Sequence, residues 1–329
     1  MPVDPLTQAF VDTVVAAGGP PLYTLTPDAA RRVLAQAQAG NVPKLPADIE
    51  DATFPVGPTG SVRVRLVRPP GARGKLPAVV YLHGGGWILG DLETHDRLVR
   101  EIANGAGVTV VMVDYERSPE ARYPVSVEQA YAVTRFVAEH ADVLAIDRAR
   151  LAVAGDSAGG QMATAVALLA KERKGPKLAF QVLLYPVTDA DFDTPSYRQF
   201  ADGPWLTREA MKWFWNAYCP DVARRGEPLA SPLRASADQL SGLPPTLVIT
   251  GENDVLRDEG EAFASKLAQA GVRVTSVRYN GTIHDFLMLD GLRDTPAARA
   301  AIALTNELLR QTLGASQPQG ARVPEVENV

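Results

Sequence analysis

The chain has 329 residues, of which 46% are hydrophobic and 22% charged, and its formal net charge is -5 at pH 7. No stretch reaches the roughly 18 uninterrupted apolar residues of a membrane span. The negative charge without basic clusters argues against a nucleic-acid partner, because phosphate backbones are bound by concentrated Lys and Arg. The single cysteine, Cys219, excludes an intrachain disulfide and any multi-cysteine metal site.

Two helices are predicted before the first strand, over residues 5–17 and 27–39. Thr26 fits the N-cap of the second helix, with Pro27 at its first helical position. The N-terminal stretch carries Asp4 and Asp12 and no basic region, so it does not resemble a secretory signal. Together with the lone cysteine, this favours a cytoplasmic protein.

Strand and helix patterns then alternate along the chain. Strands are predicted at residues 62–67, 78–82, 108–113, 151–154, 179–184, 246–250 and 274–279. Helices are predicted at residues 96–104, 125–140, 159–174, 259–270 and 295–313. Several strands are continuous apolar runs, such as PAVVYL and FQVLLY, which is typical of parallel strands covered on both faces. The sequence therefore predicts an α/β protein with a mostly parallel sheet between helices.

One long insertion, at about residues 190–226, breaks this alternation. It is first polar and then aromatic, and contains Trp205, Trp213 and Trp215. Connections of this length usually cover a site or form a subdomain. We expect a cap made of residues 1–45 and this insertion, a catalytic domain over residues 46–314, and a mobile tail over residues 315–329.

The segment Gly155-Asp156-Ser157-Ala158-Gly159 matches GxSxG and stands between a predicted strand and a predicted helix. In that context the pattern indicates a nucleophile elbow, a sharp turn that exposes a serine hydroxyl. The alternative is a glycine-rich turn that binds phosphate. Neither GxGxxG nor GxxxxGK[ST] is present, which disfavours it.

A serine nucleophile needs a base, and the chain has four histidines. His140 ends an amphipathic helix and reads as a surface residue, while His95 reads as a helix-start residue. His83 precedes three glycines and belongs to a different motif. His284 follows the last predicted strand, at the same edge of the sheet as Ser157, and is the expected base.

The acid that orients the histidine is expected between these two residues in the chain. Glu252, Asp254, Asp258 and Glu259 follow the strand at residues 246–250. Asp258 and Glu259 fit the first turn of the next helix, where acids stabilise the helix end. Asp254 lies on the loop and is the preferred acid.

The segment YLHGGGW, residues 81–87, follows an apolar strand and matches the HGGG-type loop of an oxyanion hole. Glycines let backbone N–H groups approach a substrate carbonyl. Gly84, Gly85 and Gly86 are the candidate donors, with Gly85 and Gly86 preferred, and the amide of Ala158 is the further donor.

These residues together closely resemble the hormone-sensitive-lipase-like esterases, bacterial family IV of the α/β-hydrolase fold. The motifs that carry the resemblance are HGGGW at 83–87, YERSPEARYP at 115–124, GDSAGG at 155–160, YPVTD at 185–189, DVLRDEG at 254–260, and His284. The resemblance implies hydrolysis of short-chain carboxylic esters, a cap built from the N-terminal helices and an insertion, Asp254 as the triad acid, and frequent dimers.

The chain departs from the usual family pattern at three positions. Glu116 stands within the YRLAPE motif, Val255 replaces the proline of DPLRDEG, and Asp285 replaces the glycine of HGF. The two extra carboxylates bear on substrate preference and pH behaviour, because they add negative charge near the expected core and catalytic loop.

The expected reaction is acyl transfer from a small ester to Ser157, followed by hydrolysis, with no metal or organic cofactor. Trp87 and Asp156 are expected to contact the substrate. The tryptophans of the insertion fit either the substrate pocket or plain packing. A non-catalytic receptor, a lyase of the same fold and a long-chain lipase are the alternatives, of which the presence of His284 disfavours the receptor.

Overall fold

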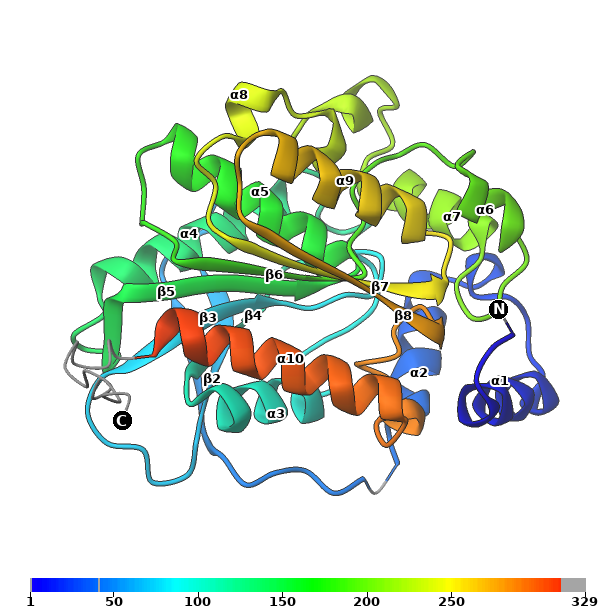
Figure 1. Cartoon of the computed structure of the whole chain (residues 1–329), viewed down its shortest axis with the longest axis horizontal. Coiled ribbons are helices and arrows are strands. Elements are labelled where there is room, and N and C mark those ends of the chain that lie inside the picture. Colours follow the sequence, from blue (N-terminus) through cyan, green and yellow to red (C-terminus); the bar gives the residue numbers. More distant parts are fainter. Residues whose placement is uncertain (1, 41, 315–329) are drawn as a thin grey trace, which may run out of the picture.

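The computed structural model describes residues 2–40 and 42–314. One twisted eight-stranded sheet runs through the molecule in the order β1-β2-β4-β3-β5-β6-β7-β8 (Figure 1). The strands are β1 Asp48–Phe54, β2 Val62–Arg68, β3 Leu76–Leu82, β4 Thr109–Asp114, β5 Ile146–Asp156, β6 Phe180–Leu184, β7 Thr246–Asn253 and β8 Val274–Ile283. β1, β2 and β4 pair antiparallel, and β4, β3, β5, β6, β7 and β8 pair parallel. The sheet is therefore mostly parallel, as predicted from the sequence.

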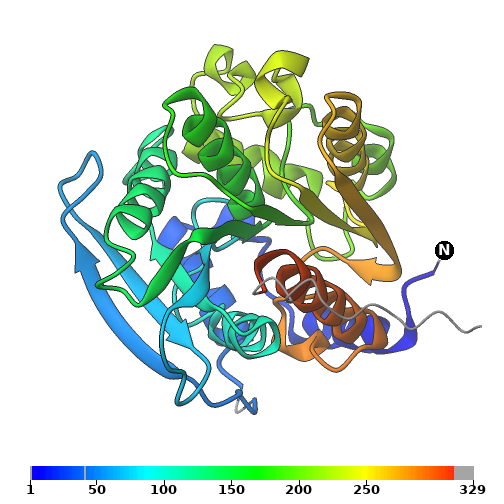
Figure 2. The same cartoon turned by 60° about the vertical axis from the view of Figure 1, so that its left-hand side comes forward.

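Helices cover both faces of the sheet (Figures 1 and 2). The α-helices are α1 Pro5–Ala17, α2 Pro27–Ala37, α3 Asp96–Ala106, α4 Val125–Glu139, α5 Ala158–Glu172, α6 Pro195–Gln199, α7 Arg208–Tyr218, α8 Ala237–Leu240, α9 Arg257–Gln269 and α10 Pro296–Leu313. α3 and α10 pack side by side on one face, and α4, α5 and α9 cover the other. This double cover explains why the central strands are apolar along their whole length: every residue of β6 is buried.

The first strand, β1, was not predicted from the sequence. Its sequence, DIEDATF, has three acids and is mostly exposed, so it lacks an apolar run. It forms at the sheet edge because its acids face arginines of β2: Asp51 accepts from Arg65 at 2.6 Å, and Glu50 from Arg68 at 3.1 Å. Opposite charges on paired strands stabilise such an edge modestly.

Four helices gather at the carboxyl edge of the parallel strands: α1 and α2 from the N-terminus, and α6 and α7 from the insertion (Figure 1). The α2 start follows the predicted rule, since Thr26 accepts a hydrogen bond from the N–H of Ala29 and Pro27 begins the helix. No helix within residues 2–40 and 42–314 has the length and apolarity needed to cross a membrane. The tail expected at residues 315–329 lies outside the described residues.

Candidate active site

The turn between β5 and α5 presents Ser157 at the carboxyl edge of the sheet. Its backbone angles are φ 54° and ψ -120°, a strained conformation for a residue with a side chain. The turn is tight: a Cβ on Gly159 would collide with the carbonyl oxygen of Leu82, and one on Gly155 with the carbonyl of Gly159. The glycines are therefore required by close backbone contact on either side of the serine.

Three side chains from separate loops form a continuous hydrogen-bonded chain. His284 follows β8, and its Nε2 lies 2.9 Å from Ser157 Oγ. Its Nδ1 lies 2.7 Å from Oδ2 of Asp254, which follows β7 and is 1% exposed. Because β7 and β8 are paired neighbours in the sheet, their ends bring the imidazole and the carboxylate together.

The other candidate acids are engaged elsewhere. Asp258 accepts from the backbone N–H of Ser196 at 2.7 Å. Glu259 is buried and accepts from the N–H groups of Thr188 and Asp189. Glu252 accepts from the N–H of Gly281. These contacts hold loops together at the same edge of the sheet, away from the imidazole of His284.

The electrostatics of His284 are set by burial and by two carboxylates. Burial alone would lower its pKa, but Asp254 and Asp285 outweigh it and raise the pKa of His284 to about 9. Asp285 Oδ1 lies 3.3 Å from Nε2, the same nitrogen that faces Ser157. Burial raises the pKa of Asp285, and the charge of His284 opposes that rise. The imidazole is thus flanked by an acid on each ring nitrogen.

The glycine loop after β3 divides its amides between two tasks. The N–H of Gly84 donates to Asp156 Oδ1 at 3.0 Å, so this amide is not free to bind an oxyanion, in contrast to the sequence expectation. Gly85 and Gly86 line the cavity beside Ser157. Ala158 is the first residue of α5, where helix N–H groups have no acceptor within the helix. Gly85, Gly86 and Ala158 are therefore the amides available to an oxyanion.

Asp156 holds this loop rather than facing the cavity. It is fully buried and also accepts from Tyr81 Oη at 2.7 Å and contacts His95 Nε2 at 3.2 Å. Burial would raise the pKa of Asp156, but His95 and Tyr81 lower it, while the pKa of His95 rises against its own burial because Asp156 is close. The side chain of Asp156 turns inward under the glycine loop and does not line the cavity, in contrast to its expected substrate contact.

Trp87 likewise lies behind the cavity wall. It is fully buried, its Nε1 donates to Gln161 Oε1 at 2.9 Å, and its ring stacks on Tyr218 of α7 at 4.1 Å between centroids. It does not line the cavity, in contrast to its expected substrate contact. Its role in this structure is to fasten the end of the glycine loop to α5 and α7.

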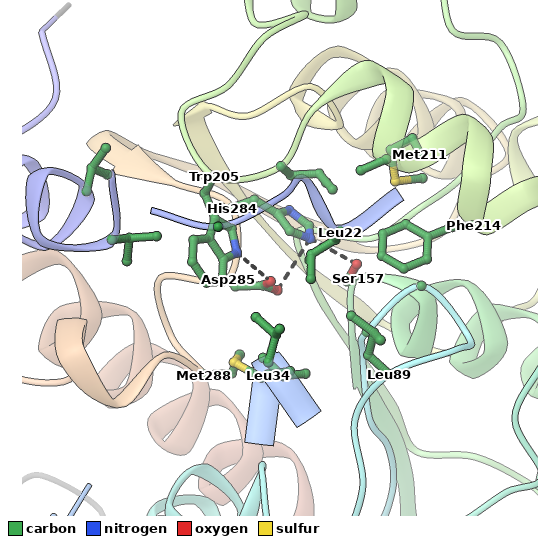
Figure 3. A pocket seen from close by; sticks show the side chains of 18 of the residues that line it. Leu22, Leu34, Leu89, Ser157, Trp205, Met211, Phe214, His284, Asp285 and Met288 are labelled. Atoms are coloured by element: carbon green, nitrogen blue, oxygen red, sulfur yellow. Dashed lines mark hydrogen bonds and ion pairs between the residues drawn. The ribbon is translucent and has the colours of Figure 1, made fainter. Parts of the chain in front are cut away.

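A cavity of about 470 Å³ opens above the serine (Figure 3). Its walls are mostly apolar and come from the N-terminal segment with α1 and α2, from the insertion with α7, and from the loops after β3, β5 and β8. The lining residues are Val11, Val14, Val15, Gly18, Gly19, Pro20, Leu22, Val33, Leu34, Gly85, Gly86, Leu89, Ser157, Trp205, Leu206, Ala210, Met211, Phe214, His284, Asp285 and Met288. The N-terminal segment and the insertion, loops included, therefore supply most of the residues that line the cavity.

Two polar lining residues were not assigned to the site from the sequence. Asp285 was noted only as a departure beside the catalytic loop, and Trp205 only as one of three tryptophans in the insertion. The Nε1 of Trp205 donates to Asp285 Oδ2 at 3.0 Å (Figure 3). Trp213 and Trp215 do not line the cavity.

Within the described part of the chain, no group of three or more His, Cys, Asp or Glu side chains could hold a metal ion.

Comparison with known proteins gives consistent matches. A family model described as the alpha/beta hydrolase fold matches residues 79–288. Ethyl acetate hydrolase of Pseudomonas putida is 37% identical over 298 residues, covering 89% of this chain and 92% of that protein. A carboxylesterase of Mycobacterium tuberculosis is 42% identical over 241 residues, covering 73% and 75%. The crystal structure of a thermostable esterase from Pseudomonas putida superposes with a TM-score of 0.92 at 50% identity, covering 95% of this chain and 98% of the other.

Proposed function

The chain belongs to the α/β-hydrolase fold family and is a hormone-sensitive-lipase-like carboxylesterase; from this premise we propose that it cleaves short- to medium-chain esters through an acyl-enzyme on Ser157. The observation that carries the proposal is the contact of His284 with Ser157 Oγ at 2.9 Å and with Asp254 at 2.7 Å. A nucleophile, a base and an orienting acid in one hydrogen-bonded chain are the requirements of acyl transfer.

In the first half-reaction, His284 Nε2 takes the Ser157 proton as Oγ attacks the ester carbonyl carbon. Asp254 accepts the Nδ1–H, which fixes the tautomer and stabilises the imidazolium. The N–H groups of Gly85, Gly86 and Ala158 bind the oxyanion. The imidazolium then passes its proton to the alkoxide oxygen as the carbon–oxygen bond breaks, and the alcohol leaves.

In the second half-reaction, His284 takes a proton from water, whose oxygen attacks the acyl carbon. The tetrahedral intermediate occupies the same amides, and its collapse returns the proton from His284 to Ser157 Oγ and releases the acid. The strained turn at Ser157 and the N-terminus of α5 support this step, because they place Oγ and the positive helix end at the same point.

The cavity supports the preference for shorter chains. Its volume of about 470 Å³ and its apolar walls suit a small ester, and one relative is an ethyl acetate hydrolase. We assign residues 1–45 and about 190–226 to a cap, since these two segments supply most of the residues that line the cavity. A cytoplasmic location and a homodimer stay predictions.

Hydrolysis of p-nitrophenyl butyrate tests the proposal. Wild type should turn over, and Ser157→Ala should lose at least about 10⁴-fold in kcat while keeping the same thermal unfolding transition. Ser61→Ala is the matched control, because Ser61 is exposed and does not line the cavity. Full activity in Ser157→Ala would refute the assignment.

An acyl-length series from acetate to palmitate separates an esterase from a long-chain lipase. We expect kcat/KM to peak at or below about ten carbons, since a cavity of about 470 Å³ has to hold both the acyl chain and the alcohol part of the ester. A maximum beyond that length would favour the lipase alternative. The absence of any ester turnover would favour the receptor or the lyase.

A further inference from the structure

The walls of the catalytic cavity are mostly apolar, and their polar side chains are Ser157, Trp205, His284 and Asp285. Among the described residues that line it, Asp285 is the one acidic side chain, and no lysine or arginine lines it. The Asp285 side chain is 16% exposed. A carboxylate held in an apolar cavity interacts strongly with charges on a bound ligand, because little water screens it.

Asp285 faces the nitrogen that serves the leaving group. Its Oδ1 lies 3.3 Å from His284 Nε2. In acyl transfer this nitrogen donates its proton to the leaving oxygen, and such a transfer needs the two atoms within about 3 Å. The leaving oxygen therefore lies within about 6 Å of the carboxylate of Asp285. The alcohol part of the ester, rather than the acyl part, starts beside this charge.

The carboxylate is held in this direction by the insertion. Trp205 Nε1 donates to Oδ2 at 3.0 Å, and the Trp205 ring packs on Phe10 of α1 at 5.6 Å between centroids. An ionised carboxylate has about four acceptor sites, so contacts with Trp205 and His284 leave capacity for a ligand. Figure 3 shows the carboxylate between Trp205 and His284, at the wall of the cavity.

Resting on the esterase function proposed above, we propose that Asp285 is a specificity-determining residue for the alcohol part of the substrate. It favours esters whose alcohol carries an ammonium group two or three bonds from the ester oxygen, and it disfavours esters with a carboxylate there. Opposite charge attracts in this apolar cavity, and the ammonium N–H can donate to the free lone pairs of Asp285.

Three butyrate esters of similar shape test the proposal at pH 7. The cation is 2-(dimethylammonio)ethyl butyrate, its neutral isostere is 3-methylbutyl butyrate, and the anion is 3-(butyryloxy)propanoate. The measured quantity is kcat/KM for each charged ester divided by kcat/KM for the neutral ester. This ratio cancels any effect of a substitution on His284 itself, since that effect is common to all three substrates.

Asp285→Asn should lower the cation-to-neutral ratio about tenfold or more, the scale of a hydrogen bond between charged groups, and should raise the anion-to-neutral ratio. Asp285 has a φ of 63°, a conformation that Asn and Gly adopt readily. Asp285→Gly is therefore a second variant that removes the carboxylate without backbone strain, and it should act in the same direction.

Asp202→Asn is the matched control, because Asp202 is exposed, lies on the insertion that also carries Trp205, and does not line the cavity. Both ratios should stay unchanged in this variant. Ratios that are equal in wild type and both Asp285 variants, with hydrolysis still dependent on Ser157, would overturn this inference and leave the esterase intact. A failure of the esterase function looks different, since no ester would then be hydrolysed or Ser157→Ala would retain activity.

Discussion

The two carboxylates on the imidazole of His284 predict an alkaline pH profile. Burial would lower the pKa of His284, but Asp254 on Nδ1, Asp285 beside Nε2 and the more distant Asp156 raise it to about 9. Only the neutral imidazole can take the Ser157 proton. For a neutral ester, kcat/KM should therefore rise with pH, with its acidic limb near pH 9, and fall as His284 becomes protonated below it.

Replacing one carboxylate moves this limb by an amount that the geometry bounds. An opposite charge within about 4–6 Å shifts a pKa by about 1–3 units. Asp285 Oδ1 lies 3.3 Å from Nε2, and the substitution Asp285→Asn leaves in place Asp254, whose Oδ2 lies 2.7 Å from Nδ1 in this structure. We therefore expect the acidic limb to fall by about 1–2 units, which corresponds to about 1.4–2.7 kcal/mol. At pH 7 this raises kcat/KM for a neutral ester about tenfold or more.

The assay is the pH dependence of kcat/KM for p-nitrophenyl butyrate between pH 5.5 and 9.5 in wild type, Asp285→Asn and Asp202→Asn. The pH profile of Asp202→Asn should match that of wild type, because this substitution removes one negative charge outside the cavity. An acidic limb that stays in place or moves upward in Asp285→Asn would refute the reasoning, since it would show that Asp285 does not stabilise the imidazolium.

Folding stability should change in the opposite sense to activity over the same window. The folded pKa of His284, about 9, lies above its ordinary value of 6.5, so the folded state binds this proton more tightly. The contribution is complete below pH 6.5 and is lost as pH rises through 9. For this fully buried ring it amounts to about 3 kcal/mol. Thermal unfolding in wild type should therefore show a lower Tm at pH 9 than at pH 7, less so in Asp285→Asn.

Further substitutions test the triad acid, the anchor of the glycine loop and the fit of Gly86 through ester hydrolysis. Asp254→Asn should lower kcat about 10⁴-fold, whereas Asp258→Asn should stay near wild type; the reverse order would move the triad acid. Asp156→Asn should lower kcat about 10²- to 10³-fold with little change in KM, because the glycine loop loses its anchor; an unchanged kcat would show that the loop keeps its shape without the charge. Gly86→Ala, whose Cβ meets the ring of Phe214 at a φ of 60°, should lower kcat, and added Phe214→Ala should recover part of it; no recovery would assign the loss to backbone strain alone.

Much of the sheet follows from patterns that the sequence carries locally. The apolar runs of β3, β4, β6 and β7 are continuous because helices cover both faces, so they were recognisable without any knowledge of the fold. β1 was missed because its stability comes from charge pairing with β2 across the sheet edge. That information is divided between two segments and leaves no pattern in either one alone.

The site likewise has features that the local sequence predicts and features that depend on distant residues. Glycine spacing around Ser157 reflects contacts within one turn and could be recognised in the sequence. The direction of a side chain inside such a turn could not. Asp156 and Trp87 adjoin the reacting groups in sequence, yet both turn away from the cavity, one toward His95 and the other toward Gln161. Their partners are separated from them by more than sixty positions, so only the folded chain selects which face they occupy.

This division explains where substrate preference can vary. The glycine loop and the serine turn are fixed by backbone contacts, since a Cβ on Gly84, Gly155 or Gly159 would meet other atoms at once. The walls from α1, α2 and α7 are made of side chains and carry no such constraint. Asp285 combines both properties, since its backbone is constrained and its side chain forms part of the cavity wall. Its φ of 63° favours glycine, asparagine or aspartate at this position, while its side chain points into the cavity. The backbone thus favours small or short polar residues beside the leaving group, and in this chain the residue is an aspartate.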